Sequence, residues 1–143
     1  MTSQVTTYQS RPNLLLWYSA DEPDGSQDPL NATSNAYATI TSLDAYHPVS
    51  LVLNCQDYQF QSYAVGADVI LQDTFMIGNN VTWSNEWNIP CTPDYGDCGC
   101  DNCKGVFEDI TDRMDEYAQR IQILGWELEK VLWAVPQGFG QEQ

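Results

Sequence analysis

The sequence has few basic residues and a single histidine. Its 143 residues contain 5 lysines and arginines against 20 aspartates and glutamates, which gives a formal net charge of −15. Nucleic acids and anionic membranes are bound through lysine and arginine, so neither is an expected partner. With His47 alone, no Ser-His-Asp or Cys-His arrangement is convincing. The simplest role of the acidic surface is solubility.

Long apolar runs are also missing. No stretch approaches the roughly 20 apolar residues that cross a membrane, and residues 1–8 lack the basic and apolar regions of a signal peptide. Two glycosylation sequons, at Asn31 and Asn80, and a group of cysteines are nevertheless typical of secreted proteins. An extracellular protein, of which this chain is an internal piece, reconciles these observations.

An apolar run that begins at Leu14 ends in an acidic pair, Asp21 and Glu22. Such a run predicts a strand buried on both faces, as in parallel sheets. Pro23 cannot continue the strand ladder, so the chain must turn there. The acidic pair then lies at the carboxyl end of the strand, where α/β folds place their chemistry. We expect any active site to lie at Glu22.

Strands and helices alternate along the rest of the chain. Helical spacing or capping residues predict helices at about 3–10, 29–45, 58–63 and 106–124, the last closed by Gly125. Apolar runs predict strands at 49–54, 67–71 and 130–136, which end near Asn54, Asp73 and Gln137. This alternation indicates parallel strands in a single α/β domain of residues 1–143, a partial (β/α) barrel or an open sheet. Its unpaired sheet edges predict self-association.

Residues 74–104 have no helix or strand period and form a long loop rich in cysteine and tryptophan. Loops longer than about 12–15 residues are usually functional or disordered. The loop's cysteines are Cys91, Cys98, Cys100 and Cys103. Their C-x6-C-x-C-x2-C spacing lacks the paired C-x2-C knuckles of zinc sites, so two disulfides are favoured over zinc, with three connectivities open. Cys55 is left over, either as a buried thiol or paired outside this chain.

Three segments together resemble one family. Residues 17–23 (WYSADEP) resemble the "WY-x-x-DEP" segment of glycoside-hydrolase-like TIM barrels, largely uncharacterised, that include secreted fungal members. Residues 67–73 resemble that family's "aDvi…D" strand, and residues 133–140 (WAVPQGFG) its "w-x-v-x-Q-x-F-G" strand. The resemblance implies the fourth to seventh strands of a barrel that hydrolyses glycosidic bonds, with Glu22 as general acid/base. The larger retaining superfamily has a nucleophilic glutamate where this chain has Gln137.

Glycoside hydrolysis needs two carboxyl groups, about 5–5.5 Å apart for retention or about 6.5–9.5 Å for inversion. Apolar neighbours such as Trp17 and Tyr18 would raise the pKa of Glu22. Asp73 is the first choice for the second carboxyl group, ahead of Asp21, Asp57 and Glu142. The expected substrate-binding residues are Trp17, Asp21, Asn54, Asp57, Trp83, Trp87 and Gln137.

Each of these residues also has a structural explanation. Glu22 could be a turn residue, the aspartates could cap backbone N–H groups, and the loop tryptophans could form a small core. The resemblance implies a carbohydrate substrate, and no metal or organic cofactor is implied. The main alternative is a non-catalytic carbohydrate-binding relative, which Gln137 favours. A small zinc module on the cysteine loop is a third possibility.

Overall fold

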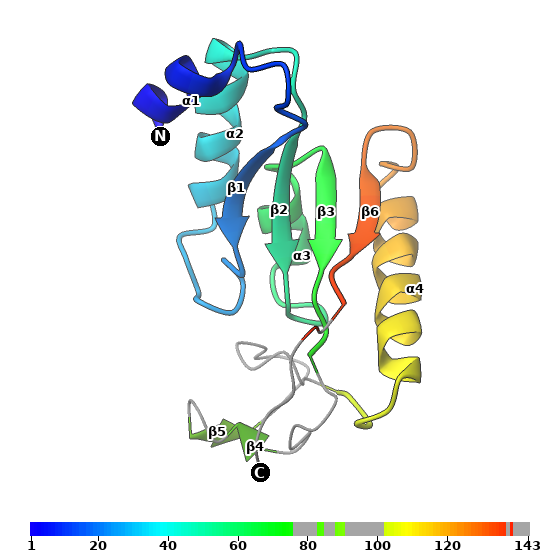
Figure 1. The fold of residues 1–143 in the computed structure, drawn as a ribbon. Coiled ribbons are helices and arrows are strands. Elements are labelled where there is room, and N and C mark those ends of the chain that lie inside the picture. The colour runs from blue at the N-terminus through cyan, green and yellow to red at the C-terminus, as the bar shows by residue number, and fades with distance from the viewer. Residues whose placement is uncertain (76–82, 85–87, 91–101, 137, 139–143) are drawn as a thin grey trace.

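The computed structural model describes residues 1–75, 83–84, 88–90, 102–136 and 138. Its elements in chain order are α1 (Thr2–Tyr8), β1 (Trp17–Asp21), α2 (Ala32–Leu43), β2 (Val49–Leu53), α3 (Phe60–Ala64), β3 (Val69–Gln72), β4 (Trp83–Ser84), β5 (Ile89–Pro90), α4 (Glu108–Ile123) and β6 (Val131–Ala134). Figure 1 shows β1, β2, β3 and β6 side by side, all pointing the same way. None of the described helices is long and apolar enough to span a membrane.

The main sheet has the strand order β1-β2-β3-β6, and every neighbouring pair is parallel. Each strand is therefore followed in space by the next strand of this sheet along the chain. The predicted α/β class with alternating parallel strands is confirmed. The described part of the long loop adds a separate antiparallel pair, β4 and β5.

One face of the sheet packs against the helices. Leu51, Leu53 and Ile70 project from the central strands into a cluster with Tyr117 and Ile121 of α4. The same cluster includes three residues of α3: Phe60, Tyr63 and Ala64. Burial of these apolar side chains is the main force that holds the helices to the sheet.

The first two helices cover the same face at its amino-terminal end. Val5 of α1 and Ile40 of α2 form a second buried cluster with Val49, and Trp17 packs against it. Val49 alternates with Leu51 and Leu53 along β2, so both clusters lie on one side of the sheet.

The opposite side is called the open face here. It carries the residues that alternate with the core positions: Tyr18, Ser50, Val52, Val69, Leu71, Val131 and Trp133. None of the described helices covers it, because the core clusters that hold them all lie on the other side.

The amino-terminal boundaries of two elements differ from the prediction. The strand expected from Leu14 begins at Trp17, because Trp17 is the first residue that pairs with β2. The second helix was expected to begin at about residue 29, but α2 begins at Ala32 and its N-cap residue is Asn31. Residues 30–31 instead lie in a turn, and the Asp28 N–H donates to the carbonyl of Pro23.

The carboxyl end of α4 follows the prediction. Gly125 has φ of +72°, the Gly125 N–H donates to the carbonyl of Gln122, and the Trp126 N–H donates to that of Ile121. This pair of bonds is a Schellman motif, for which glycine is the preferred residue.

The buried stripe of α4 differs from the apolar stripe that was predicted. It contains two charged residues, Asp109 and Arg113, beside Tyr117 and Ile121. Asp109 accepts backbone N–H bonds from residues 104–106, and Arg113 donates to the carbonyl of Asn54 at 2.9 Å. These bonds fix the start of α4 beside the carboxyl end of β2.

Candidate functional site

The carboxyl ends of β1, β2 and β3 lie at one edge of the sheet, which we call the rim. Parallel pairing sets Asp21 beside Val52, and Leu53 beside Gln72, so the residues that follow these strands meet there. Glu22 follows β1 and donates its backbone N–H to the carbonyl of Val52. Asp73 follows β3 and donates in the same way to Leu53. The rim therefore collects acidic side chains from separate parts of the sequence.

Glu22 and Asp73 share a side-chain hydrogen bond. Asp73 is only 3% exposed, whereas Glu22 is half-buried. Burial raises the pKa of Asp73 well above its usual range, and the hydrogen bond and negative charge of Glu22 raise it further. Two carboxyl groups in contact oppose each other's ionisation, which favours the protonated form of Asp73.

Two further features mark this pair as unusual. Oδ1 of Asp73 is buried and has no hydrogen-bond partner among the described residues. The backbone of Glu22 has φ of +45°, a left-handed conformation that non-glycine residues rarely adopt. Backbone strain and unsatisfied buried polar atoms both concentrate at functional sites.

Tyr18 belongs to the same group, and the sequence had placed it beside Glu22 as an apolar neighbour but not as a hydrogen-bond donor. Its hydroxyl donates a hydrogen bond of 2.8 Å to Oδ1 of Asp21. Burial, that bond and the nearby charges of Asp21, Asp73 and Glu22 raise the pKa of Tyr18. A register shift between Tyr18 and Ala20 brings Tyr18 and Asp21 to the same face. Simple alternation along the strand would instead place Tyr18 and Asp21 on opposite faces.

Asp24 is a residue of the rim that the sequence did not identify. It is 2% exposed and accepts backbone N–H bonds from Gly25 (3.0 Å), Asn54 (3.3 Å) and Cys55 (2.8 Å). Burial raises the pKa of Asp24 to about 6, although these bonds oppose the shift. Asp24 thus ties the segment after β1 to the end of β2 and adds negative charge near Asp73.

Trp17 does not lie at the rim, which corrects the expectation that it binds substrate beside Glu22. It lies at the other end of β1, roughly 15 Å away at the usual rise of a strand. Its indole donates to Asp44 at 2.9 Å, within a network that includes His47. Desolvation opposes ionisation of Asp44, but these hydrogen bonds outweigh it and lower the pKa of Asp44 to about 2. Trp17 is therefore a structural residue of the amino-terminal edge.

Asn54 and Asp57 have different surroundings. Asn54 is 2% exposed at the end of β2, and its Oδ1 accepts a bond from the Cys55 thiol at 3.4 Å. Asp57 forms an ion pair of 2.8 Å with Arg120 of α4 and lines an outer hollow with Phe60. Asp57 thus pairs on the helix side of the sheet, away from the open face.

Several expected site residues lie in or near the long loop. Trp83 is 40% exposed in β4. Asn31, the first sequon asparagine, is exposed at the start of α2, and the hydroxyl of its Thr33 donates to the carbonyl of Tyr63. The remaining predicted site residues lie outside the described residues: Asn80, Trp87, Cys91, Cys98, Cys100, Gln137 and Glu142.

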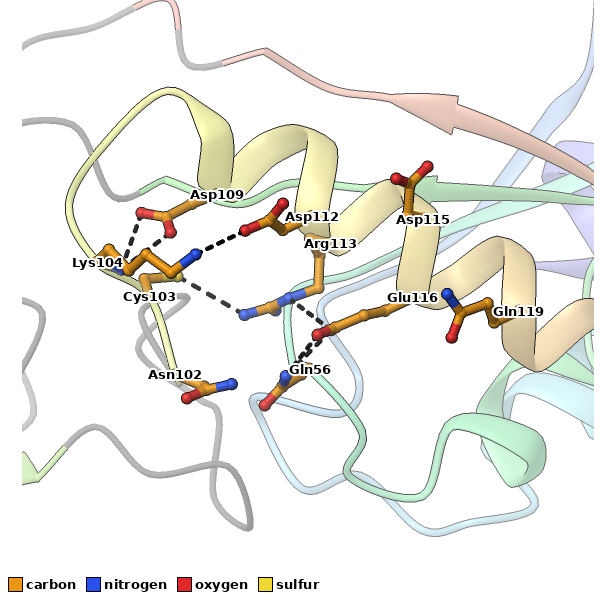
Figure 2. Close-up of a pocket in the computed structure, with 10 residues that line it drawn as sticks. All are labelled: Gln56, Asn102, Cys103, Lys104, Asp109, Asp112, Arg113, Asp115, Glu116 and Gln119. Carbon is orange, nitrogen blue, oxygen red and sulfur yellow. Dashed lines mark hydrogen bonds and ion pairs between the residues drawn. The ribbon is translucent and has the colours of Figure 1, made fainter.

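A separate hollow of about 470 Å³ lies at the start of α4 (Figure 2). Its side chains pair with one another: Lys104 with Asp112 at 2.9 Å, and Glu116 with Gln56 at 2.9 Å and with Arg113 at 3.8 Å. Cys103 also lines it, with its sulfur 3.7 Å from a guanidinium nitrogen of Arg113. The described residues contain no group of three His, Cys, Asp or Glu side chains placed to hold a metal ion.

Comparison with known proteins returned no match: no family model, no curated protein and no solved structure is similar to this chain. The function must therefore be inferred from the rim itself.

Proposed function

We propose that this protein hydrolyses O-glycosidic bonds in an extracellular poly- or oligosaccharide. The observation that carries the proposal is the hydrogen bond between Glu22 and Asp73 at the rim. Cleavage of a glycosidic bond needs a carboxylic acid that keeps its proton near neutral pH and gives it to the leaving oxygen. Burial and mutual contact supply such an acid here. The resemblance of residues 17–23 to glycoside-hydrolase-like barrels points to the same chemistry.

The two carboxyl groups have different roles in this proposal. Glu22 is half-buried and so can reach a sugar, whereas Asp73 is almost fully buried behind it. Glu22 takes the proton of the pair from Asp73 and gives it to the glycosidic oxygen, and the bond from that oxygen to the anomeric carbon breaks with its electron pair remaining on the oxygen. Asp73 is a positioning residue that holds the proton of the pair next to Glu22.

A direct hydrogen bond brings two carboxyl groups closer than the about 5–5.5 Å of a retaining pair. The sequence predicted that Asp73 would face Glu22 across the scissile bond. The direct contact between the two carboxyl groups rules this arrangement out. We assign the role of the second carboxyl group to Asp21, which lies on the same face as Tyr18 and accepts a hydrogen bond from its hydroxyl. Asp21 takes a proton from the water that attacks the anomeric carbon, which restores the balance of protons.

A non-catalytic carbohydrate-binding protein is the second candidate. The same direct contact favours it, because a closed pair leaves no room for a sugar between Glu22 and Asp73. Tyr18, which is 54% exposed next to Asp21, would then offer an aromatic surface to a sugar ring.

The test is a hydrolysis assay with soluble glucan, xylan, mannan and chitin oligosaccharides, in which new reducing ends are measured. Glu22→Gln keeps the shape of the side chain but cannot pass a proton to the substrate, so we expect a loss of about 10²–10⁴-fold in rate. The matched control is Glu127→Gln, the same change at an exposed position, which should leave the rate unchanged. Binding without hydrolysis by the unmodified protein would favour the second candidate. An unchanged rate in Glu22→Gln would refute the assigned role.

A further inference from the structure

The sheet has the features of one half of a closed parallel barrel. Its four strands lie in the unbroken order β1-β2-β3-β6, all parallel, and the described helices pack on one face. A (β/α) barrel has this arrangement throughout, with eight strands and the helices outside. The open face corresponds to the interior of such a barrel, which is filled with side chains.

The exposed apolar side chains on the open face are confined to its two edge strands. Tyr18 of β1 is 54% exposed, and Val131 and Trp133 of β6 are 53% and 44% exposed. On the central strands, Ser50 and Val52 of the same face are buried. The part of the face that lacks cover is therefore the part next to the unpaired edges.

One partner can pair with both edge strands, β1 and β6, only if its own strands run parallel to them. In the described part of the chain, β1 pairs only with β2, and β6 only with β3. A second copy, rotated by half a turn about an axis along the strands, places its β1 parallel to β6 and its β6 parallel to β1. The two contacts are identical, and the assembly closes at eight strands with no edge left.

We propose that two copies of this chain form one eight-stranded barrel, in which β6 of each copy pairs with β1 of the other. The open face of each copy is thus covered by the open face of the other, and Trp133 packs inside the shared barrel. Both Glu22–Asp73 pairs then lie at the same rim. This assembly is independent of the proposed hydrolytic activity.

The net negative charge of each copy opposes dimerisation, and the salt dependence of the dimer measures this repulsion. Each copy carries a formal charge of −15, so the two copies repel each other at low ionic strength. Apolar burial and strand pairing must supply the attraction. Because salt screens exposed charges over a distance of about 10 Å at 0.1 M, the dimer should become tighter as salt is added.

The experiment is sedimentation equilibrium of the whole chain between 5 and 200 µM, at two salt concentrations. We expect a monomer–dimer equilibrium that stops at the dimer and is strengthened by salt. Trp133→Lys places a charge inside the shared barrel and should weaken dimerisation at least 10-fold. The control is Ile123→Lys on α4, an 83% exposed apolar position off the open face, which should leave dimerisation unchanged.

A second measurement does not depend on how the variants fold. Hydrogen exchange of the unmodified chain should show that amides of β1 and β6 become more protected as concentration rises, while those of α4 do not. A monomer at all concentrations would overturn the proposal, as would open-ended oligomers or equal effects of Trp133→Lys and Ile123→Lys.

Discussion

At the scale of single residues, Asp73 connects stability with the proposed chemistry. It is 3% exposed, and its pKa is raised by burial and by Glu22. An unfolded chain releases this proton near pH 3.9, whereas the folded chain keeps it to higher pH. Over that interval the folded state binds more protons, so the contribution of Asp73 to stability falls as the pH rises.

Replacing Asp73 with asparagine should therefore stabilise the fold at neutral pH. Asparagine resembles the protonated acid and carries no proton to lose, so the gain over the unmodified protein should grow between pH 4 and pH 8. We expect it to reach about 1–3 kcal/mol, the penalty of a buried, poorly paired polar group. Denaturant unfolding at several pH values measures the difference.

Asp115→Asn is the control, since Asp115 is exposed on α4 and its substitution should have no such pH dependence. A gain from Asp73→Asn that is the same at pH 4 and pH 8 would show that the proton is not held in the fold. Under the proposed function the same variant loses hydrolytic rate, because Glu22 loses the acid beside it.

The sequence predicts where Glu22 and Asp73 lie, but not that they touch. Both residues follow predicted strands, and the carboxyl ends of neighbouring parallel strands lie at the same edge of a sheet. Neither their contact nor the left-handed backbone of Glu22 follows from a sequence pattern. The hydrogen bond from Tyr18 to Asp21 was missed because the register shift between Tyr18 and Ala20 changes the side to which the residues after it point.

At the scale of elements, the packing of α2 against α3 depends on Gly66. A Cβ atom at this position would lie 2.4 Å from the backbone carbonyl carbon of Thr33, and backbone cannot move aside as a flexible side chain does. Thr33 is itself fixed, because its hydroxyl donates to the carbonyl of Tyr63 at 2.8 Å.

We therefore expect Gly66→Ala to destabilise the fold by about 1–3 kcal/mol, the usual effect of overpacking. Gly138→Ala is the control, because a Cβ atom there meets nothing within 4 Å. Denaturant unfolding of both variants gives the comparison. Equal stability of the two variants would mean that α2 and α3 do not approach as closely as described.

The elements themselves were predictable to different degrees. The carboxyl end of α4 was predictable because Gly125 is a specific signal. The buried face of the same helix was not, because Arg113 and Asp109 are charged and apolar periodicity assigns such residues to solvent. Their burial becomes understandable only once the carbonyl of Asn54 and the backbone N–H groups of residues 104–106 are seen beside them.

At the scale of the whole molecule, strand order and direction follow from the alternation of strands and helices. Parallel neighbours joined by right-handed crossovers leave few other arrangements. The exposure of the open face does not follow from the sequence, because the apolar run that contains Val131 and Trp133 predicts a buried strand. Their exposure of 53% and 44% appears only in the folded chain, and it is the reason for the proposed two-copy barrel.

The measurement that tests the central claim most directly is a carbon NMR titration of the Glu22 and Asp73 carboxyl groups between pH 3 and pH 10. A shared proton predicts that one of the two signals titrates near the usual range, and that the other stays protonated beyond pH 7. The two signals should also respond to each other, and Glu22→Gln should lower the pKa of Asp73. If both groups titrate independently near pH 4, the pair holds no proton and the proposed acid does not exist.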